Sequence, residues 1–369
     1  MNLKTIYVKL LTIIYTFFSC FSTFALEVVL LSPAKVDNQF WVQVNLIAHA
    51  AANDLGINLT IVHGNGHRLY QKEQLNKIIT SLKRPDYIIF LPYDGTAHHS
   101  FNLLEQAKVP FLTLEKTLFR KQQKQLGKPG QRFKYWLGEV FHDNKKAGEL
   151  LAQTLIKASG ARNARKSKLN VVGISGDISG HSNRRNAGLM AALATNPHHS
   201  LAQIVSARWQ RDITSQMIVS LLSRYPEIDI VWTSADIMAL GVLDVIDKLD
   251  RKINENLFIG GFDWSNEALI AIKNDQYTAS VGGHFMQAAW ALVKLFDHHQ
   301  GYAKLPSNEG SIAYQLQLID KDNINDHLVL IENPNWDKID FEEFSVSNNS
   351  SSKNEQFDFS KVIKALTSQ

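Results

Sequence analysis

The stretch IDIVWTSADIMALG, residues 228–241, decides the fold class of this chain. It begins with a mostly apolar block, Ile228–Trp232, and passes through a short polar turn into a helical pattern that starts at Met238. A strand that is apolar along nearly its whole length is typical of a parallel strand covered on both faces. The stretch therefore predicts a strand followed directly by a helix, the repeating unit of a doubly wound α/β sheet.

The same alternation runs along the chain from Val28 onward. Ten strand-like blocks are separated by segments with apolar residues at helical spacing, and ten strands are too many for one modest sheet. We therefore predict an α/β fold with two doubly wound sheets. The predicted strands are 28–31, 59–62, 87–91, 110–114, 135–137, 169–174, 204–207, 228–232, 257–261 and 278–281. The predicted helices are 41–55, 72–82, 144–158, 183–194, 212–223, 238–249 and 286–298.

The first 25 residues have the pattern of a cleavable export signal. Lys4 and Lys9 form a short basic head, and an apolar run follows over residues 10–24. Thr23 and Ala25 place small residues where a signal peptidase requires them. The run spans about fifteen residues, fewer than the roughly 20 that cross a bilayer comfortably. We therefore predict a signal peptide at 1–25 and a mature protein in the periplasm.

Two alternatives remain open for this segment. It could stay as an uncleaved membrane anchor, although the strand at Val28 then begins without a linker. Cys20 could carry a lipid, although Phe17, Phe18 and Ser19 match the usual approach to a lipid-attachment cysteine poorly. Because Cys20 is the single cysteine, a chain cut after Ala25 has no disulfide, thiol nucleophile or thiolate metal ligand.

The charge balance argues against nucleic-acid binding. The chain has 39 Lys and Arg against 35 Asp and Glu, a formal charge of +4. Without Lys4 and Lys9, 37 basic residues face 35 acidic ones, a balance of +2. The basic tract 162–168 is expected to be a solvated loop, so no basic footprint for nucleic acid is present.

Motifs of enzymes and metal sites are missing from the sequence. It contains no H-E-x-x-H, G-x-S-x-G or complete G-x-G-x-x-G word. The pairs His98-His99, His198-His199 and His298-His299 lie at helix ends or in loops, without acidic or Cys partners at metal-ligand spacing. We therefore predict no enzymatic activity, no cofactor and no metal.

Several short words narrow the fold further. Residues 37–41 (DNQFW) follow the first predicted strand, 236–241 (DIMALG) follow the eighth, and 260–263 (GGFD) end the ninth. Together with 112–116 (LTLEK) and 182–188 (SNRRNAG), they resemble the type I periplasmic binding proteins. That family includes the ribose- and galactose-binding proteins, the ligand domains of lactose-repressor-like regulators and the autoinducer-2 receptor. The resemblance covers roughly residues 27–330.

The resemblance implies two Rossmann-like lobes joined by three crossing strands, with the ligand trapped between them on hinge closure. The N-terminal lobe is expected at 27–138 plus 284–310, and the C-terminal lobe at 139–283 plus 311–333. The three crossings are expected at 138–143, near Asp263 and near Gly282-Gly283. A signal peptide stands where the repressors carry a DNA-binding helix pair, so a transcription factor is not expected.

The resemblance also implies a function. The leading hypothesis is a periplasmic solute-binding protein that captures a sugar or sugar-like molecule and delivers it to an inner-membrane ABC permease. The alternative is a receptor, similar to that of autoinducer-2, that presents its ligand to the periplasmic domain of a sensor kinase or cyclase.

A sugar site needs planar polar groups at its edge and aromatic rings above and below the sugar. Loops after strands carry such residues, on the side where doubly wound sheets bind ligands. By the resemblance, Arg185 is the ligand arginine, with Arg184 toward solvent. The resemblance assigns ligand contacts to Asn38, Phe40, Trp41, Arg185, Trp209, Arg211, Asp236 and Asp263.

Other roles stay open for most of these residues. Asn38 would serve equally well as a helix cap, and Phe40 and Trp41 could face the core. Trp209, Arg211 and Asp263 could be hinge or surface structure. The loop 176–182 opens a helix and could receive an anion, so an acidic or phosphorylated ligand is not excluded.

The sequence also departs from the ribose-type pattern. Ala235 replaces an amide, which leaves Asp236 as the nearest polar group, and Leu91-Pro92 replace a polar position. Glu115-Lys116 replaces Asp-Arg. Gly283 stands where a glutamine or a second arginine is expected, which argues against the borate form of autoinducer-2. The pocket is therefore not a copied ribose site.

Two segments break the alternation. Residues 117–134 form a polar, basic insertion, expected as an exposed hairpin or loop. Residues 334–369 are expected to be a flexible C-terminal tail, with disorder at 345–354. Near the C-terminus, apolar residues from Phe357 to Leu366 are compatible with a short helix that either packs on the body or binds a partner.

Overall fold

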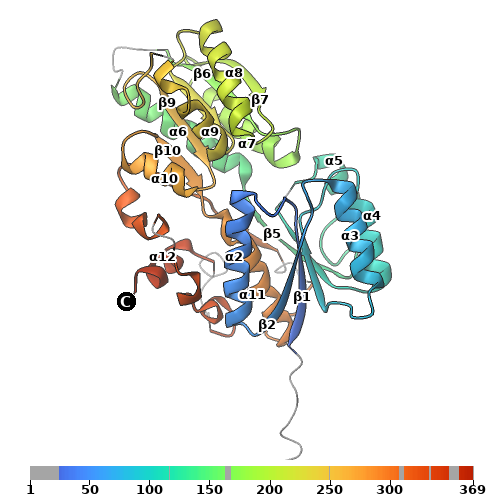
Figure 1. Cartoon of the computed structure of the whole chain (residues 1–369). Helices are drawn as coiled ribbons and strands as arrows, with labels where there is room; N and C mark the ends of the chain where they lie inside the picture. Colours follow the sequence, from blue (N-terminus) through green and yellow to red (C-terminus); the bar gives the residue numbers. More distant parts are fainter. Residues whose placement is uncertain are drawn as a thin grey trace, which may run out of the picture.

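The apolar blocks of the sequence form the strands of two separate sheets (Figure 1). The structure, a computed structural model, describes residues 25–115, 117–162, 168–248, 250–306, 311–331, 334–348 and 357–368. The predicted signal peptide lies outside these residues, except for Ala25. Among the described residues, no helix is both long enough and apolar enough to span a membrane.

The first sheet has the strand order β11-β5-β4-β3-β1-β2, with every pairing parallel. Helices α2 and α11 cover one face, and α3 and α4 cover the other. We call this sheet with its helices the first lobe. Its strands are β1 (Leu26–Ser32), β2 (Ile57–His63), β3 (Tyr87–Phe90), β4 (Phe111–Leu114), β5 (Trp136–His142) and β11 (Ile312–Tyr314). Its helices are α2 (Gln39–Asp54), α3 (Arg68–Thr80), α4 (Ala97–Ala107), α5 (Arg120–Leu126) and α11 (Gln287–His299).

The second sheet repeats this arrangement in the order β12-β10-β9-β8-β6-β7, with only β12 antiparallel. Helices α6 and α7 pack together, and α8 packs on α9. We call this sheet with its helices the second lobe. Its strands are β6 (Asn170–Ser175), β7 (Ser200–Ser206), β8 (Ile230–Thr233), β9 (Phe258–Phe262), β10 (Ala279–Gly282) and β12 (Gln317–Asp320). Its helices are α6 (Asn144–Arg162), α7 (Gly180–Ala194), α8 (Arg211–Arg224), α9 (Asp236–Leu243) and α10 (Asn266–Lys273).

The sheets confirm the predicted doubly wound α/β fold and correct its boundaries. Strand β5 continues to His142 in the first sheet, so the first lobe extends four residues beyond its predicted end at 138, and the first crossing lies at Asp143, the last residue of the predicted crossing 138–143. Strand β11 pairs with β5, although residues from 311 onward were expected in the second lobe. The chain does not cross at Asp263, because β9 and β10 both belong to the second sheet. The other crossings lie at Gly283 and between β11 and β12.

The insertion at 117–134 is not a free loop. It contains α5, and the side chains of Leu118, Leu126 and Phe133 are buried against the α3–α4 face of the first sheet. The expectation of an exposed hairpin is therefore wrong, because three apolar side chains spaced along the polar segment anchor it.

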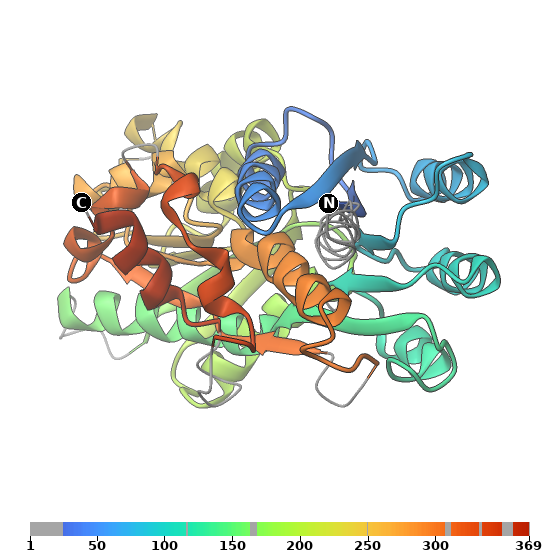
Figure 2. The same ribbon diagram turned by 90° about the horizontal axis from the view of Figure 1, so that it is seen from below.

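The C-terminal segment is also packed rather than free. Short 3₁₀ turns at Trp336–Lys338 and Phe341–Phe344 precede α12 (Phe359–Thr367). Buried aromatic and aliphatic side chains hold it on the body, where it lies beside α2 and α11 (Figure 2). The predicted terminal helix that packs on the body is confirmed, whereas a flexible tail is wrong for residues 334–348 and 357–368. Of the predicted disordered stretch, residues 349–354 lie outside the described residues.

Candidate functional site

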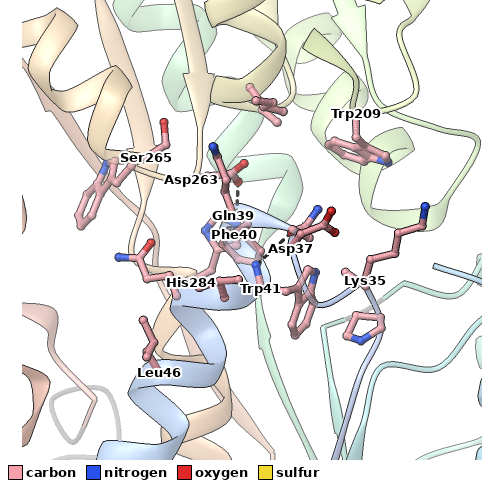
Figure 3. A pocket seen from close by; sticks show the side chains of 18 of the residues that line it. Lys35, Asp37, Gln39, Phe40, Trp41, Leu46, Trp209, Asp263, Ser265 and His284 are labelled. Carbon is pink, nitrogen blue, oxygen red and sulfur yellow. Dashed lines mark hydrogen bonds and ion pairs between the residues drawn. The ribbon is translucent and has the colours of Figure 1, made fainter. Parts of the chain in front are cut away.

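A cleft of about 1640 Å³ lies between the two lobes. It opens at the carboxyl ends of the strands, where loops after β1, β3 and β4 face loops after β6, β7 and β9. Doubly wound sheets bind ligands at this edge. Figure 3 shows that side chains from both lobes point into it, with Trp41 on one side and Trp209 on the other.

The first lobe contributes an aromatic pair at the start of α2. Asn38 caps this helix, since its Oδ1 accepts a hydrogen bond from the Trp41 backbone N–H at 3.1 Å. The cap fixes the direction in which Phe40 and Trp41 leave the loop, and their rings meet edge to face at 5.6 Å between centroids. Both rings line the cleft, so the predicted aromatic pair lies there, and Asn38 holds it in place.

Arg185 lies at the centre of the second lobe's wall. Its guanidinium donates from Nε to Asn144 Oδ1 at 2.8 Å and from Nη1 to the Ser234 carbonyl at 2.7 Å. It also lies 4.3 Å from the centroid of the Phe262 ring. Only 4% of Arg185 is exposed, yet it lines the cleft. The arginine is therefore a fixed, preorganised donor rather than a mobile surface charge.

Asp263 and His284 form the polar floor of the cleft. Asp263 Oδ1 lies 3.1 Å from His284 Nε2 and 3.9 Å from Arg185 Nη1. Burial raises the pKa of Asp263 to about 7, although Arg185 opposes this. Burial, together with the Arg185 charge, lowers the pKa of His284 to about 3, so His284 is neutral near pH 7. Phe40 packs on the His284 ring at 4.6 Å.

Trp209 forms the aromatic wall of the second lobe. Its ring stacks on His181 with centroids 5.3 Å apart. The ring lies directly over Gly176, where an added Cβ would clash with it. Its backbone has φ +61, a left-handed conformation that costs energy for a tryptophan. The local backbone thus turns the ring into the cleft.

Two predicted ligand residues lie elsewhere. Arg211 makes paired hydrogen bonds to Asp244 at 2.6 Å and to Glu267 at 2.7 Å, so both faces of its fork are occupied. It does not line the cleft and joins α8 to the ends of α9 and α10.

Asp236 is fully buried at the start of α9. It accepts hydrogen bonds from the Ser280 hydroxyl at 2.8 Å, the Tyr277 hydroxyl at 3.0 Å and the Ser265 backbone N–H at 3.0 Å. Burial raises its pKa well above the ordinary value, and the Asp263 charge adds to this. Asp236 therefore braces the loop after Asp263 and has no exposed atom for a ligand. Of the predicted ligand residues, the structure therefore does not bring Arg211 or an exposed atom of Asp236 to the surface of the cleft.

Tyr93, Glu115, His181 and His284 are among the cleft residues that sequence reasoning missed. Glu115 directly follows β4, is 6% exposed and accepts a hydrogen bond from Gln287 Nε2 at 3.2 Å. Burial alone would raise its pKa, but the histidines around it, His181 first, and Arg185 lower it below the ordinary value. Each of the four follows a strand at the carboxyl edge of a sheet. This position after a predicted strand is the sequence feature that could have identified them.

The loop before α7 does not offer an empty anion site. Ser179 caps α7 by accepting from the Ser182 backbone N–H, and the hydroxyls of Ser179 and Ser182 both donate to Asp177 Oδ1. The Asp177 carboxylate, which lines the cleft, places a negative charge beside the start of α7, where an anionic ligand would bind. The open alternative of an acidic or phosphorylated ligand is thereby disfavoured.

Arg184, expected to face solvent, reaches the other lobe. Its Nη2 donates to the Leu118 carbonyl at 2.9 Å and to Gln123 Oε1 at 3.3 Å. Beside it, an added Cβ on Gly180 would clash with the Thr117 carbonyl oxygen. We call this contact between 117–123 and α7 the latch. The lobes are therefore in direct contact on the α5 side of the cleft.

The histidine pairs make contacts of an ordinary structural kind. His98 Nδ1 contacts Asn102 Nδ2 at 2.9 Å, His199 Nδ1 accepts from the Leu169 backbone N–H at 3.3 Å, and Nδ1 of His298 lies 3.3 Å from the Ala303 carbonyl oxygen. Over the part of the chain that the structure describes, no three His, Cys, Asp or Glu side chains converge in a way that could hold a metal ion.

Comparison with known proteins points to one family. The profile of the periplasmic binding protein domain matches residues 28–303. Among curated relatives, the ribose import binding protein of Salmonella typhimurium is 21% identical over 258 residues, which cover 70% of this chain and 79% of that protein.

Solved structures agree with this match. A periplasmic sugar-binding protein from Pseudomonas fluorescens is 25% identical, with a TM-score of 0.80, and the match covers 92% of this chain and 99% of that one. A periplasmic solute-binding protein of an ABC transporter from Actinobacillus succinogenes, solved with bound D-allose, shares the fold. It is 20% identical with a TM-score of 0.68, over 81% of this chain and 98% of that chain.

Proposed function

Because this chain belongs to the periplasmic binding protein family, we propose that it captures a sugar or sugar-like molecule in the interlobe cleft. In this proposal the protein is exported to the periplasm and delivers its ligand to an ABC permease in the inner membrane. It works by binding alone, without a cofactor.

One observation carries the proposal: the cleft combines aromatic rings with fixed polar groups. Trp41 and Trp209 line the cleft from opposite lobes (Figure 3). Arg185, a donor, and Asp263, an acceptor, line the same cleft and lie 3.9 Å apart. A sugar has C–H faces that pack on rings and a rim of hydroxyls that both donate and accept hydrogen bonds. The arrangement of the cleft complements both features.

The preorganisation of Arg185 supports binding rather than catalysis. Asn144 and Ser234 hold its guanidinium before any ligand arrives, so little side-chain entropy is lost on binding. His284 is held neutral, which lets the floor of the cleft exchange hydrogen bonds with hydroxyls without adding a charge.

Thermal-shift and calorimetric screening of the mature protein against sugars and polyols tests the proposal. A ligand that binds only the folded state should raise the melting temperature increasingly with its concentration. A panel of pentoses, hexoses, furanoses and polyols without any such response would refute sugar capture.

The receptor alternative shares the same cleft and differs in the protein that binds the loaded form. In the sequence, the insertion at 117–134 and the C-terminal segment favoured this alternative, as surfaces that a transport component does not need. The structure, however, packs apolar side chains of both segments into the body. Pull-down of the loaded protein with the permease or with a periplasmic sensor domain decides between the two.

A further inference from the structure

The cleft continues well beyond the residues that face Arg185 and Asp263. One stripe of α2 lines it along nearly the full length of the helix, at spacings of three and four residues. The stripe consists of Gln39, Gln43, Leu46, Ala50 and Asn53. At 1.5 Å per residue, the 14 steps from Gln39 to Asn53 span about 21 Å. We call this part of the cleft the outer groove.

Other parts of the chain complete the lining of the cleft. Asn266 and Ile270 of α10 line it together with α2. Asn335 and Trp336 of the C-terminal segment line it too, and the Trp336 ring packs on Phe285 at 5.8 Å, next to His284 of the floor. The match to the family profile ends at residue 303, so this part of the lining comes from chain outside the matched region.

The size of the cleft exceeds what a single small ligand fills. Its volume of about 1640 Å³ lies above the roughly 300–1,000 Å³ of pockets that enclose drug-sized ligands. The large volume of the cleft is not explained by an open hinge alone, because contacts between different parts of the chain already exist on two sides of it. The latch already brings Gly180 of the second lobe against Thr117 of the first. On the other side, Phe359 of the C-terminal segment packs on Trp264 of the second lobe at 5.1 Å.

The chemistry of the outer groove is that of a neutral, hydroxylated ligand. Carboxamides recur along it, at Gln39, Gln43 and Asn53 on α2 and at Asn266 and Asn335 elsewhere in the lining. A carboxamide carries both a donor and an acceptor in one plane. Of these five, Asn266 already donates to the Ile331 carbonyl, and Asn335 Oδ1 already accepts from the Asp337 backbone N–H. Apolar surface lies between them at Leu46 and Ile270, which are 57% and 42% exposed, whereas Trp336 is only 9% exposed.

Charged side chains are few and of one sign. Between Gln39 and Asn53 on α2, from Asn266 to Ile270 on α10, and at Pro334–Asp337, the lining residues include Glu267 and Asp337 but no Lys or Arg, and His49 of α2 lines the same surface. A polyanion is therefore disfavoured along this surface.

We propose that the ligand is a neutral oligosaccharide, with a terminal ring between Trp41 and Trp209 and further rings along the outer groove beside α2. This rests on the proposed capture of a sugar and extends it to the size of the ligand. The C-terminal segment then takes part in recognition through Asn335, which is exposed and lines the cleft, in addition to its packing on α2 and α11.

Calorimetry with matched series of gluco-, galacto-, xylo- and arabino-oligosaccharides, from one ring to four, tests the proposal. In at least one series the Kd should fall tenfold or more between the monosaccharide and the trisaccharide. The variant Leu46→Trp should fill the outer groove, because Leu46 is 57% exposed and lines it. It should return the trisaccharide to the affinity of the monosaccharide, while the Kd of the monosaccharide changes less than twofold.

The variant Leu69→Trp is the matched control. Leu69 is also 57% exposed and also on a helix, α3, but does not line the cleft. It should alter neither Kd, and circular dichroism should show both variants folded. Equal affinity for one ring and three rings in every series that binds would overturn the oligosaccharide proposal but leave sugar capture standing. A Leu46→Trp variant that binds trisaccharide like the wild type would also overturn it. Failure of every carbohydrate of any length would overturn both.

Discussion

Nε2 of His284 lies 3.1 Å from Oδ1 of Asp263, and this contact joins the end of β9 to the crossing that follows β10. Because the pKa of His284 is lowered to about 3 and that of Asp263 is raised to about 7, the aspartate is the member of the pair that titrates near neutral pH. A carboxylate accepts hydroxyl hydrogen bonds best when it is ionised. The protonation state of Asp263 should therefore control ligand affinity.

Affinity for a hydroxylated ligand should rise with pH and level off above about pH 7. Below that pH, each unit should weaken binding about tenfold, since one pKa unit corresponds to about 1.4 kcal/mol. Calorimetry from pH 5 to pH 8 checks this, with Asp263→Asn as the control in which the slope disappears. A wild-type affinity that is flat over this range would show that Asp263 does not accept from the ligand.

Stability of the ligand-free protein should show the opposite trend. A carboxyl whose folded pKa of about 7 exceeds its ordinary 3.8 holds its proton more tightly when folded. Its contribution is fully present below pH 4 and is lost as the pH rises through 7. The free energy of unfolding of the wild type minus that of Asp263→Asn, measured by urea titration at each pH, should isolate the contribution of the Asp263 carboxyl. A difference that increases with pH would contradict the prediction.

Arg185→Ala should remove measurable binding and also destabilise the fold. Hydrogen bonds to a charged group contribute about 1.5–3 kcal/mol each, so the loss of two to the ligand weakens affinity by roughly two to four decades. Because Asn144 and Ser234 lose their partner as well, the free energy of unfolding should fall. Calorimetry and urea titration measure the two effects, and wild-type affinity in this variant would place the ligand elsewhere.

Gly176→Ala should weaken binding without contacting the ligand. The new methyl would occupy the place of the Trp209 ring and turn it away from His181, which removes a stacking face worth about 1 kcal/mol. Gly160→Ala, in α6, is the control, because nothing lies within 4 Å of its added Cβ. That variant should bind normally and gain about 0.5 kcal/mol of stability. An unchanged Kd in Gly176→Ala would mean that Trp209 does not contact the ligand.

Arg184→Ala should loosen the latch. The change removes the hydrogen bonds to Leu118 and Gln123 and leaves the cleft residues in place. Small-angle scattering should give a larger radius of gyration for the ligand-free variant than for the wild type, with a smaller value again on addition of ligand. Identical curves for the two ligand-free proteins would show that the latch does not hold the lobes together.

Phe359→Ala should be the most destabilising of these changes. Its ring packs on Trp264 at 5.1 Å and on Phe285 at 5.6 Å, and removal of a buried phenylalanine side chain costs about 3–5 kcal/mol. Lys364→Ala, on the exposed side of the same helix, is the control and should change the free energy of unfolding by less than about 0.5 kcal/mol. Similar urea midpoints for the two variants would mean that α12 does not stabilise the body.

The central strands of the sheets could be predicted from the sequence because a buried parallel strand is apolar along its whole length. This pattern can be recognised without knowing which strands pair with it. The edges of the sheets were harder. Strands β11 and β12 are short, and the middle residue of the three in β11, Ala313, is exposed between two buried residues. Such strands carry little apolar signal, and only pairing with β5 and β10 defines them.

The residues of the candidate site could also be predicted only in part. Arg185, Trp41, Trp209 and Asp263 were found from the family words and lie in the cleft. Arg211 lies outside the cleft because Asp244 and Glu267, far away in sequence, hold its guanidinium. Neighbouring residues in a loop can face opposite directions, and sequence spacing in a loop does not reveal which one faces the ligand.

The late position of β11 in the chain has a consequence for the order of folding. Strand β5 ends at His142, but its neighbour Ile312–Tyr314 follows only after the whole of the other sheet. During synthesis, the edge of β5 that does not pair with β4 therefore stays unpaired until β11 has been made. Contacts this distant in sequence also form slowly. An exposed strand edge is a template for pairing with other chains. Aggregation of partly made or truncated chains should thus begin at β5, and any cut before residue 312 leaves that edge permanently open.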